Sequence, residues 1–181
     1  STALIVTMMG SMLTGCSAGS KAEAASVLNF GATNFSDSLD PSALPNAAWC
    51  VSRYGIGEAL FRFDDQMEAD YYLCDDYSVN DEHTEWTFHI REGVKFSNGK
   101  ELTASAVVDS IEYMYKQEKS GKGSTAPSQY MVYDSIKADD EARTVTIKTS
   151  KAYADLTKAL AHPFFSILDM ESDLASKPIG T

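Results

Sequence analysis

The sequence predicts an α/β fold in which helices flank a mixed β-sheet, and three consecutive patterns carry this prediction. Apolar and polar residues alternate through residues 85–91, as in a half-buried strand, and the apolar members are Trp86, Phe88 and Ile90. Asn98-Gly99 follows, a pair that readily adopts positive φ, so we expect the chain to reverse there. Through residues 103–116 the apolar residues recur every three or four positions, which predicts an amphipathic helix.

The segments before this stretch predict a strand, a helix and two more strands. Residues 27–33 are predicted as the first strand. Residues 47–61 are predicted to be largely helical, although Gly55 and Gly57 weaken the helix and indicate a bend or close packing. Two further strands are predicted after the helix, at residues 61–63 and 71–79.

The segments after the amphipathic helix predict a hairpin and short elements. Residues 117–129 are rich in Gly, Ser and Lys, which predicts a mobile connection. Residues 130–138 and 142–149 are predicted to pair as a β-hairpin around an acidic turn. The remaining predictions are a short helix at 151–161, an apolar strand-like run at 164–168, and a helical or turn segment at 169–176.

The composition excludes several classes of function. The formal net charge is −11, so nucleic acid and anionic membrane surfaces would repel the chain. Its acidic clusters fall in predicted turns and lack the spacing of a calcium loop, and its three His residues are scattered, so no metal site is predicted. The sequence has neither a phosphate-binding loop nor a nucleophile elbow. We therefore predict no enzymatic activity and no cofactor.

The N-terminal residues have the pattern of an exported lipoprotein. Residues 1–15 carry no charge and contain an apolar run too short to span a bilayer, which predicts a signal peptide. The sequence Leu13-Thr14-Gly15-Cys16 resembles the lipobox of bacterial lipoproteins, so Cys16 is the expected lipidation site and residues 16–26 a flexible tether. No basic residue precedes the apolar run and the chain does not begin with Met, so we expect a clipped N-terminus.

The central stretch resembles the signature of the family 5 extracytoplasmic solute-binding proteins, which are the binding components of ABC importers for peptides, dipeptides and nickel. Three spaced motifs carry the resemblance: Trp86, Thr87, Phe88, Ile90 and Arg91; then Val94, Lys95, Phe96 and Gly99; then Leu102, Thr103 and Ala104. The family usually has Asp where this chain has Ala106. An acidic group near the helix start is therefore missing, and another group must interact with the positive end of the helix dipole.

The resemblance implies the incomplete first lobe of a type II (cluster C) periplasmic-binding-protein-like fold. Residues 27–43 would begin lobe I, 44–165 would form a subdomain of this lobe, and 166–181 would return into it. The chain ends with Pro-Ile-Gly-Thr at 178–181, which the family continues with Gly-Pro-Tyr and a second lobe. We therefore expect an N-terminal fragment with exposed sheet edges.

The resemblance also suggests residues that contact solute. Leu39-Asp40-Pro41 resembles an early family motif at the mouth of the ligand cleft, which implies solute contacts at the preceding residues, and Tyr130 is a further candidate. The preceding residues are Thr33, Asn34, Phe35 and Ser36. Locally, an ordinary Asx-rich turn that closes on Pro41 is the better explanation.

Cys50 and Cys74 leave two interpretations open. An exported protein permits a disulfide between them. Alternatively, Cys74 stands where the family usually has a small Ala, and a lone buried thiol behaves as a small hydrophobic group.

These observations predict an extracytoplasmic lipoprotein that is anchored to the cell membrane and delivers solute to the membrane subunits of an ABC importer. By resemblance it would bind oligopeptides or dipeptides through closure of two lobes. The alternatives are a binding protein for nickel or another small solute, a surface adhesion or interaction lipoprotein, and an exported hydrolase. Because half of the contacts would come from a second lobe, residues 27–181 alone should bind peptide weakly or not at all.

Overall fold

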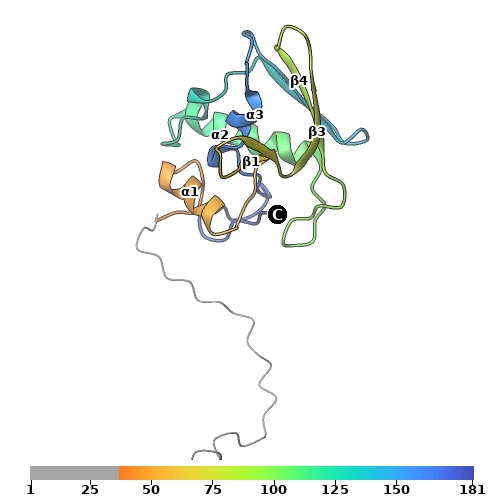
Figure 1. Cartoon of the computed structure of the whole chain (residues 1–181). Helices are drawn as coiled ribbons and strands as arrows, with labels where there is room; N and C mark the ends of the chain where they lie inside the picture. The colour runs from red at the N-terminus through yellow and green to blue at the C-terminus, as the bar shows by residue number, and fades with distance from the viewer. Residues whose placement is uncertain (1–36) are drawn as a thin grey trace, which may run out of the picture. The chain divides into compact units, whose positions relative to one another are not determined.

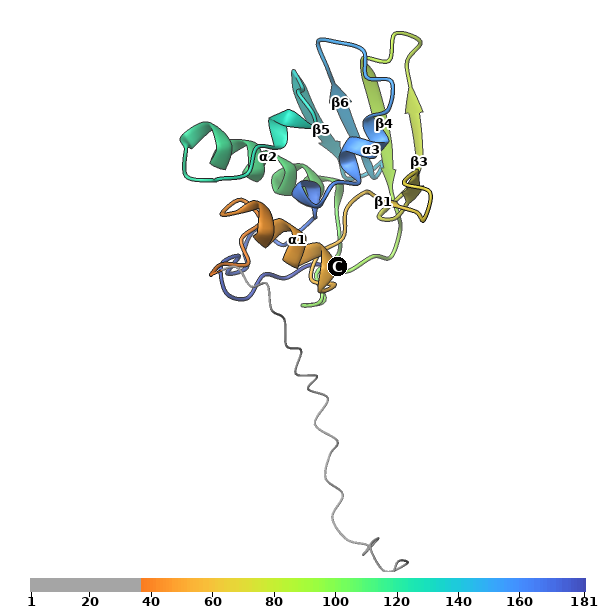
Figure 2. The ribbon, with the colours of Figure 1, turned by 60° about the vertical axis from the view of Figure 1, so that its left-hand side comes forward.

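Four antiparallel strands form the main sheet of the computed structural model, which describes residues 37–181. In spatial order they are β3 (Cys74–Val79), β4 (Glu85–Ile90), β6 (Thr144–Lys148) and β5 (Ser135–Asp139), side by side in Figure 2. A separate hairpin pairs β1 (Phe61–Phe63) with β2 (Ala69–Tyr71). The predicted α/β class is confirmed. The predicted mixed sheet needs a correction, because every strand pair within residues 37–181 is antiparallel.

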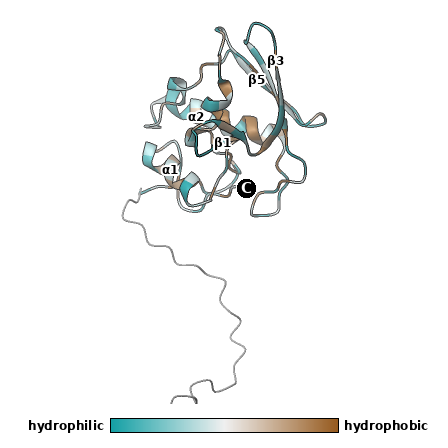
Figure 3. Ribbon diagram, viewed as in Figure 1, coloured by the Kyte–Doolittle hydropathy of each residue, from teal (hydrophilic) through white to brown (hydrophobic). Residues whose placement is uncertain are grey.

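Within residues 37–181, three α-helices and two 3₁₀ turns lie on one side of the sheet (Figure 1). They are α1 (Pro45–Arg53), α2 (Ala104–Ser120), η1 (Pro127–Gln129), α3 (Leu156–Leu160) and η2 (Pro163–Phe165). The helix α2 packs against β5 and β6, whereas α1 packs against η2. In Figure 3 apolar residues gather where α2 meets the sheet. None of the helices within residues 37–181 is long and apolar enough to cross a membrane.

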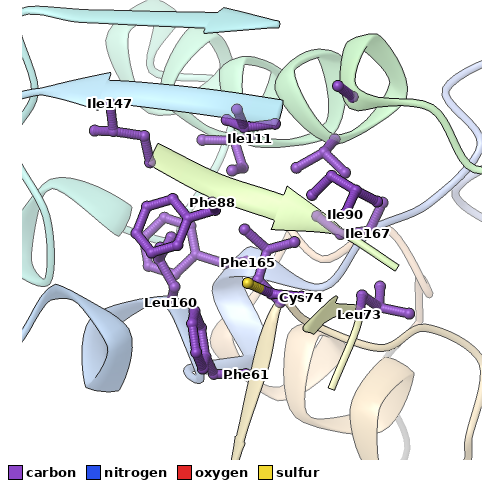
Figure 4. Packing of buried hydrophobic residues seen from close by; sticks show 14 of the residues in the cluster. Phe61, Leu73, Cys74, Phe88, Ile90, Ile111, Ile147, Leu160, Phe165 and Ile167 are labelled. Carbon is purple, nitrogen blue, oxygen red and sulfur yellow. The ribbon is translucent and has the colours of Figure 1, made fainter. Parts of the chain in front are cut away.

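The central strand β4 confirms the prediction made from alternation. Its residues alternate between half-buried and buried, and Phe88 and Ile90 are fully buried. Burial of such a side chain stabilises the fold by about 2–3 kcal/mol relative to an exposed one. Around these two residues Figure 4 shows side chains from the other elements, among them Ile111, Ile147, Leu160, Phe165 and Ile167. Residues of β4 therefore join the sheet to α2 and to the segments after α3.

The helix α2 confirms the predicted amphipathic helix and is longer than predicted. The Thr103 hydroxyl caps its start and accepts a hydrogen bond from the Ala106 backbone N–H at 3.1 Å. The helix continues to Ser120 and ends at Gly121, which adopts φ 68° as a left-handed C-cap. The prediction of a mobile connection from residue 117 is therefore wrong for its first four residues, 117–120, and residues 127–129 form η1.

The missing acidic group at the start of α2 is supplied from elsewhere in the chain. Asp140, in the turn between β5 and β6, accepts hydrogen bonds from the Ser105 backbone N–H at 2.8 Å and from the Ser105 hydroxyl at 2.7 Å. The hydrogen bond from the backbone N–H and then that from the hydroxyl lower the pKa of Asp140. A carboxylate at this helix terminus is the arrangement that the helix dipole favours.

Four other predicted elements differ from the structure. The predicted helix 47–61 ends at Arg53, because Gly55 adopts φ 66° and Gly57 lies so close to Leu168 that a Cβ would be 2.8 Å from its Cδ2. The predicted strand 71–79 is interrupted between β2 and β3. The predicted helix 151–161 shortens to α3, while the apolar run 164–168 begins within η2 and makes single β-bridges instead of a strand.

The last described residues return to the end of α1 and to the turn after β4. Leu168 and Gly180 form an antiparallel bridge, and Ser97 donates its backbone N–H to the Gly180 carbonyl at 2.8 Å. A Cβ at Gly180 would overlap the Ile56 carbonyl oxygen and lie 2.7 Å from the Gly57 Cα. Only glycine fits this crossing without a shift of the backbone. The predicted signal peptide, tether and first strand lie outside residues 37–181.

Candidate functional site

Tyr130, the predicted solute contact that the structure describes, belongs to a cluster of four rings. It follows η1 directly and is 40% exposed. Its ring stacks on the His162 imidazole with centroids 3.9 Å apart, and Phe164 meets it edge-on at 5.5 Å. Trp49 of α1 meets the edge of His162 at 5.6 Å. These four residues, named the aromatic cluster below, come from three segments that are distant in the sequence.

The turn η2 fixes two members of the aromatic cluster. His162 is its N-cap, and its Nδ1 accepts a hydrogen bond from the Phe164 backbone N–H at 3.3 Å. Pro163 occupies the first position of the turn. The Phe164 ring is buried against Ala48 of α1 and Met114 of α2. Burial also lowers the pKa of His162, so the imidazole is neutral at pH 7.

The helix α1 presents Trp49 on its outer face. The neighbouring Ala48 and Cys50 are buried, whereas Trp49 is 39% exposed. Arg53 lies one turn further along the helix, with its guanidinium carbon 5.0 Å from the centroid of the indole. The cluster therefore offers aromatic surface beside one cationic group.

A groove of about 260 Å³ adjoins the cluster and shares Trp49 with it. Its polar groups include Glu58, whose carboxylate accepts a hydrogen bond from the Thr181 hydroxyl at 3.1 Å. The hydrogen bond between the Tyr72 hydroxyl and Glu58, followed by burial, raises the pKa of Tyr72. Arg62 lies over the Tyr72 ring at 5.1 Å and lines the same groove. Cationic, anionic and aromatic groups thus continue from the cluster into the groove.

A larger hollow of about 630 Å³ lies elsewhere, along α2. Its charged lining carries both signs in equal number: Asp109, Glu112, Lys116 and Lys119. Such a lining is typical of a solvated helix face. The aromatic cluster and its groove, with exposed rings and few charges, have the composition expected of a small-molecule site.

The structure supports the turn interpretation of the Leu39-Asp40-Pro41 motif. The Asp40 carboxylate accepts a hydrogen bond from the Ser42 backbone N–H at 2.9 Å, and this bond closes an Asx-turn. The same carboxylate accepts a hydrogen bond from the Tyr113 hydroxyl at 2.6 Å. These bonds fix the segment before α1 to α2. The predicted solute contacts Thr33, Asn34, Phe35 and Ser36, and the lipidation site Cys16, lie outside the described residues.

The sequence reasoning missed Trp49, His162 and Phe164. From the sequence, His162 is considered only as one of three scattered His residues. A signal was present, because His-Pro-Phe-Phe at 162–165 places three rings around a helix-stopping proline. The position of Trp49 opposite this turn depends on how α1 packs, which the local sequence does not reveal.

Within residues 37–181 no group of three or more His, Cys, Asp and Glu side chains could hold a metal ion. Cys50 and Cys74 are both buried and no disulfide joins them, so the disulfide interpretation is wrong. Burial raises the pKa of Cys74 to about 12. Its thiol donates to the Asp76 carbonyl at 3.0 Å, as expected for the small hydrophobic group of the alternative interpretation.

Comparison with known proteins places the chain among solute-binding proteins. Residues 69–181 match "Bacterial extracellular solute-binding proteins, family 5 Middle". The nickel-binding protein NikA of Staphylococcus aureus is 34% identical over 131 residues, which are 71% of this chain and 25% of that protein. The glutathione-binding protein GsiB of Salmonella paratyphi A is 25% identical over 132 residues, which are 68% of this chain and 25% of that protein.

A solved structure agrees with this result. The crystal structure of NikA from Staphylococcus aureus in complex with Ni(L-His)2 superposes with a TM-score of 0.60 at 29% identity. The superposition covers 77% of this chain and 26% of that one. The chain therefore spans about a quarter of the length of the curated relatives that it matches.

Proposed function

This chain belongs to the family 5 bacterial extracellular solute-binding proteins, and on that basis we propose that it is the substrate-binding lipoprotein of an ABC importer for oligopeptides or dipeptides. Its role would be to capture a solute outside the cytoplasm and deliver it to the membrane subunits of the importer. It would perform no chemistry on the solute.

The observation that carries this proposal is the aromatic cluster. Trp49, which lines the groove, is 39% exposed and Tyr130 is 40% exposed, although rings of this size are usually covered in a folded protein. Both rings are held from behind, Trp49 by the buried face of α1 and Tyr130 by His162. Rigid rings lose little entropy when a ligand binds, so they suit a receptor that accepts varied side chains.

The remaining parts of the proposal concern the anchor and the lobes. Residues 1–15 would direct export, Cys16 would carry the lipid, and residues 16–26 would form the tether. Residues 27–43, 44–165 and 166–181 would belong to lobe I, with Thr33, Asn34, Phe35 and Ser36 facing the solute. Closure of a second lobe would complete the site and enclose the solute.

A second candidate solute is a nickel complex, because the relative with 34% identity is a nickel-binding protein. The described residues offer no group of three or more metal-ligating side chains. A nickel ion bound at this cluster would therefore arrive with ligands of its own. The chemistry of the aromatic cluster would then recognise those ligands and not the ion.

Titration calorimetry on the product of the whole gene tests the proposal. We expect saturable binding of short peptides or of nickel–histidine, and much weaker binding by residues 27–181 alone. A Trp49→Ala, Tyr130→Ala double variant should lose on the order of 10-fold or more in affinity while it remains folded. Unchanged affinity in this variant would contradict the placement of the solute at the aromatic cluster.

A further inference from the structure

Asn98-Gly99 is the one Asn-Gly pair in the sequence, and both residues are exposed in the turn after β4. Such an asparagine is chemically labile, because the next backbone nitrogen can attack its side-chain carbonyl carbon and glycine has no Cβ to hinder the approach. The attack joins the Gly99 nitrogen to the Asn98 Cγ and breaks the bond from Cγ to Nδ2. The amide nitrogen leaves as ammonia with the Gly99 proton, and water then opens the succinimide to aspartate or isoaspartate.

The folded turn holds each group that takes part in this reaction. The Gly99 N–H, which carries the attacking nitrogen, donates a hydrogen bond to the Phe96 carbonyl at 2.8 Å. The Asn98 Oδ1 accepts a hydrogen bond from the Lys100 backbone N–H at 3.1 Å. The leaving nitrogen, Nδ2, donates a hydrogen bond to the Asp169 Oδ2 at 2.8 Å. The turn must therefore open locally before the nitrogen can attack.

Of these three hydrogen bonds, the one to Asp169 comes from outside the turn, 71 residues further along the chain. The Asp169 side chain is buried and held on both oxygens. Its Oδ2 also lies 2.9 Å from the Lys100 Nζ, and its Oδ1 accepts a hydrogen bond from the Glu171 backbone N–H at 3.1 Å. A fixed, ionised acceptor makes a stronger hydrogen bond than a neutral one, so Asp169 contributes most to holding the amide in place.

We propose that Asn98 is a site of spontaneous deamidation and that Asp169 keeps it unreactive in the folded chain. The product carries a carboxylate at position 98 where Asn98 has a donor, so two like charges compete for Lys100. The link between the turn and the segment after Leu168 is then lost, and the Ser97 N–H bond to the Gly180 carbonyl holds that segment without it. This modification is independent of the solute and of the place where it binds.

Peptide mapping by mass spectrometry tests the proposal on the product of the whole gene, aged in mildly alkaline buffer. Asp169→Ala removes the acceptor of the Asn98 amide, and we expect deamidation about 10-fold faster than in the wild type, the size of a hydrogen bond to a charged group. Glu171→Gln is the matched control, because it removes a carboxylate from the same Lys100 and keeps the backbone N–H that Asp169 accepts. It should deamidate within about 2-fold of the wild-type rate, since exposed ion pairs contribute little.

The wild-type protein supplies a second test that needs no substitution. Asn98 should deamidate at least about 10-fold faster in urea than in native buffer, because unfolding frees all three groups. In urea Asp169→Ala and Glu171→Gln should match the wild type. Asn80, which is not followed by glycine and whose amide bonds Thr84, is the internal control and should remain intact in both conditions.

Three results would overturn the proposal. Asn98 that stays intact in urea would not be a labile site. Equal wild-type rates in urea and in native buffer would show that the fold does not protect it. A folded Asp169→Ala protein, checked by thermal unfolding, that deamidates at the wild-type rate would remove Asp169 from the explanation. If Asp169→Ala does not fold, the comparison between native buffer and urea decides alone.

Discussion

Asp140 should stabilise the fold through the first turn of α2. Its carboxylate accepts a hydrogen bond from the backbone N–H of Ser105, which lies 35 residues earlier in the chain. Asp140→Ala removes both the hydrogen bond from the Ser105 backbone N–H and the negative charge at the helix terminus. We expect a loss of about 1 kcal/mol in the free energy of unfolding, the usual size of a cap and helix-dipole contribution. The side chain is exposed, so solvent screening argues against a larger value.

The contribution of Asp140 should depend on pH with a definite sign. Its hydrogen bonds with Ser105 hold the folded-state pKa below the ordinary value. A carboxyl with a lowered folded-state pKa contributes stability that is fully present above the ordinary pKa of about 3.9 and is lost as the pH falls through the folded value. The difference in stability between wild type and Asp140→Ala should therefore be constant from pH 7 to about 5 and shrink below about 4.

Urea titrations at several pH values measure this difference on residues 37–181 or on the longer chain. Glu141→Ala is the matched control, because it changes the same charge in the same turn, and no hydrogen bond or ion pair of Glu141 is recorded within residues 37–181. The control should lose less than about 0.5 kcal/mol. Equal losses in Asp140→Ala and Glu141→Ala, or a difference between wild type and Asp140→Ala that grows as the pH falls, would refute this explanation of how the helix dipole is met.

Three other substitutions or reactions test the packing. Gly180→Ala should destabilise the fold by about 3 kcal/mol or more in urea, because its Cβ would meet backbone that cannot move freely; Gly93→Ala, with open space but φ 75°, should cost only about 1 kcal/mol. Phe88→Ala should cost about 3–5 kcal/mol in the same assay, and a loss below about 1 would contradict its place in the core. In a Cys16→Ser background, Cys50 and Cys74 should react with a thiol reagent only after denaturant is added.

The central elements could be predicted because their patterns are local. Alternation over residues 85–90 and the helical period after Thr103 each fix a buried face without reference to the rest of the chain. The turn at Asn98-Gly99 needs only a residue that tolerates positive φ, and Gly99 adopts φ 89°. Local signals also determine where α2 ends, but Gly121 was interpreted as part of a loop instead of a C-cap.

The candidate site could be predicted only in part, because it depends on contacts between distant segments. Tyr130 was proposed from resemblance, yet its role depends on His162, which reaches it through the turn after α3. Trp49 joins them because α1 packs against η2, and no local sequence pattern predicts that contact. The carboxylate that serves α2 is likewise supplied from the β5–β6 turn.

The position of the bound solute tests the central claim most directly. A crystal structure of the product of the whole gene, grown with the tightest-binding peptide or nickel complex, would show it. We predict that the solute lies against Trp49 and Tyr130. A well-ordered solute that contacts neither ring would contradict the claim.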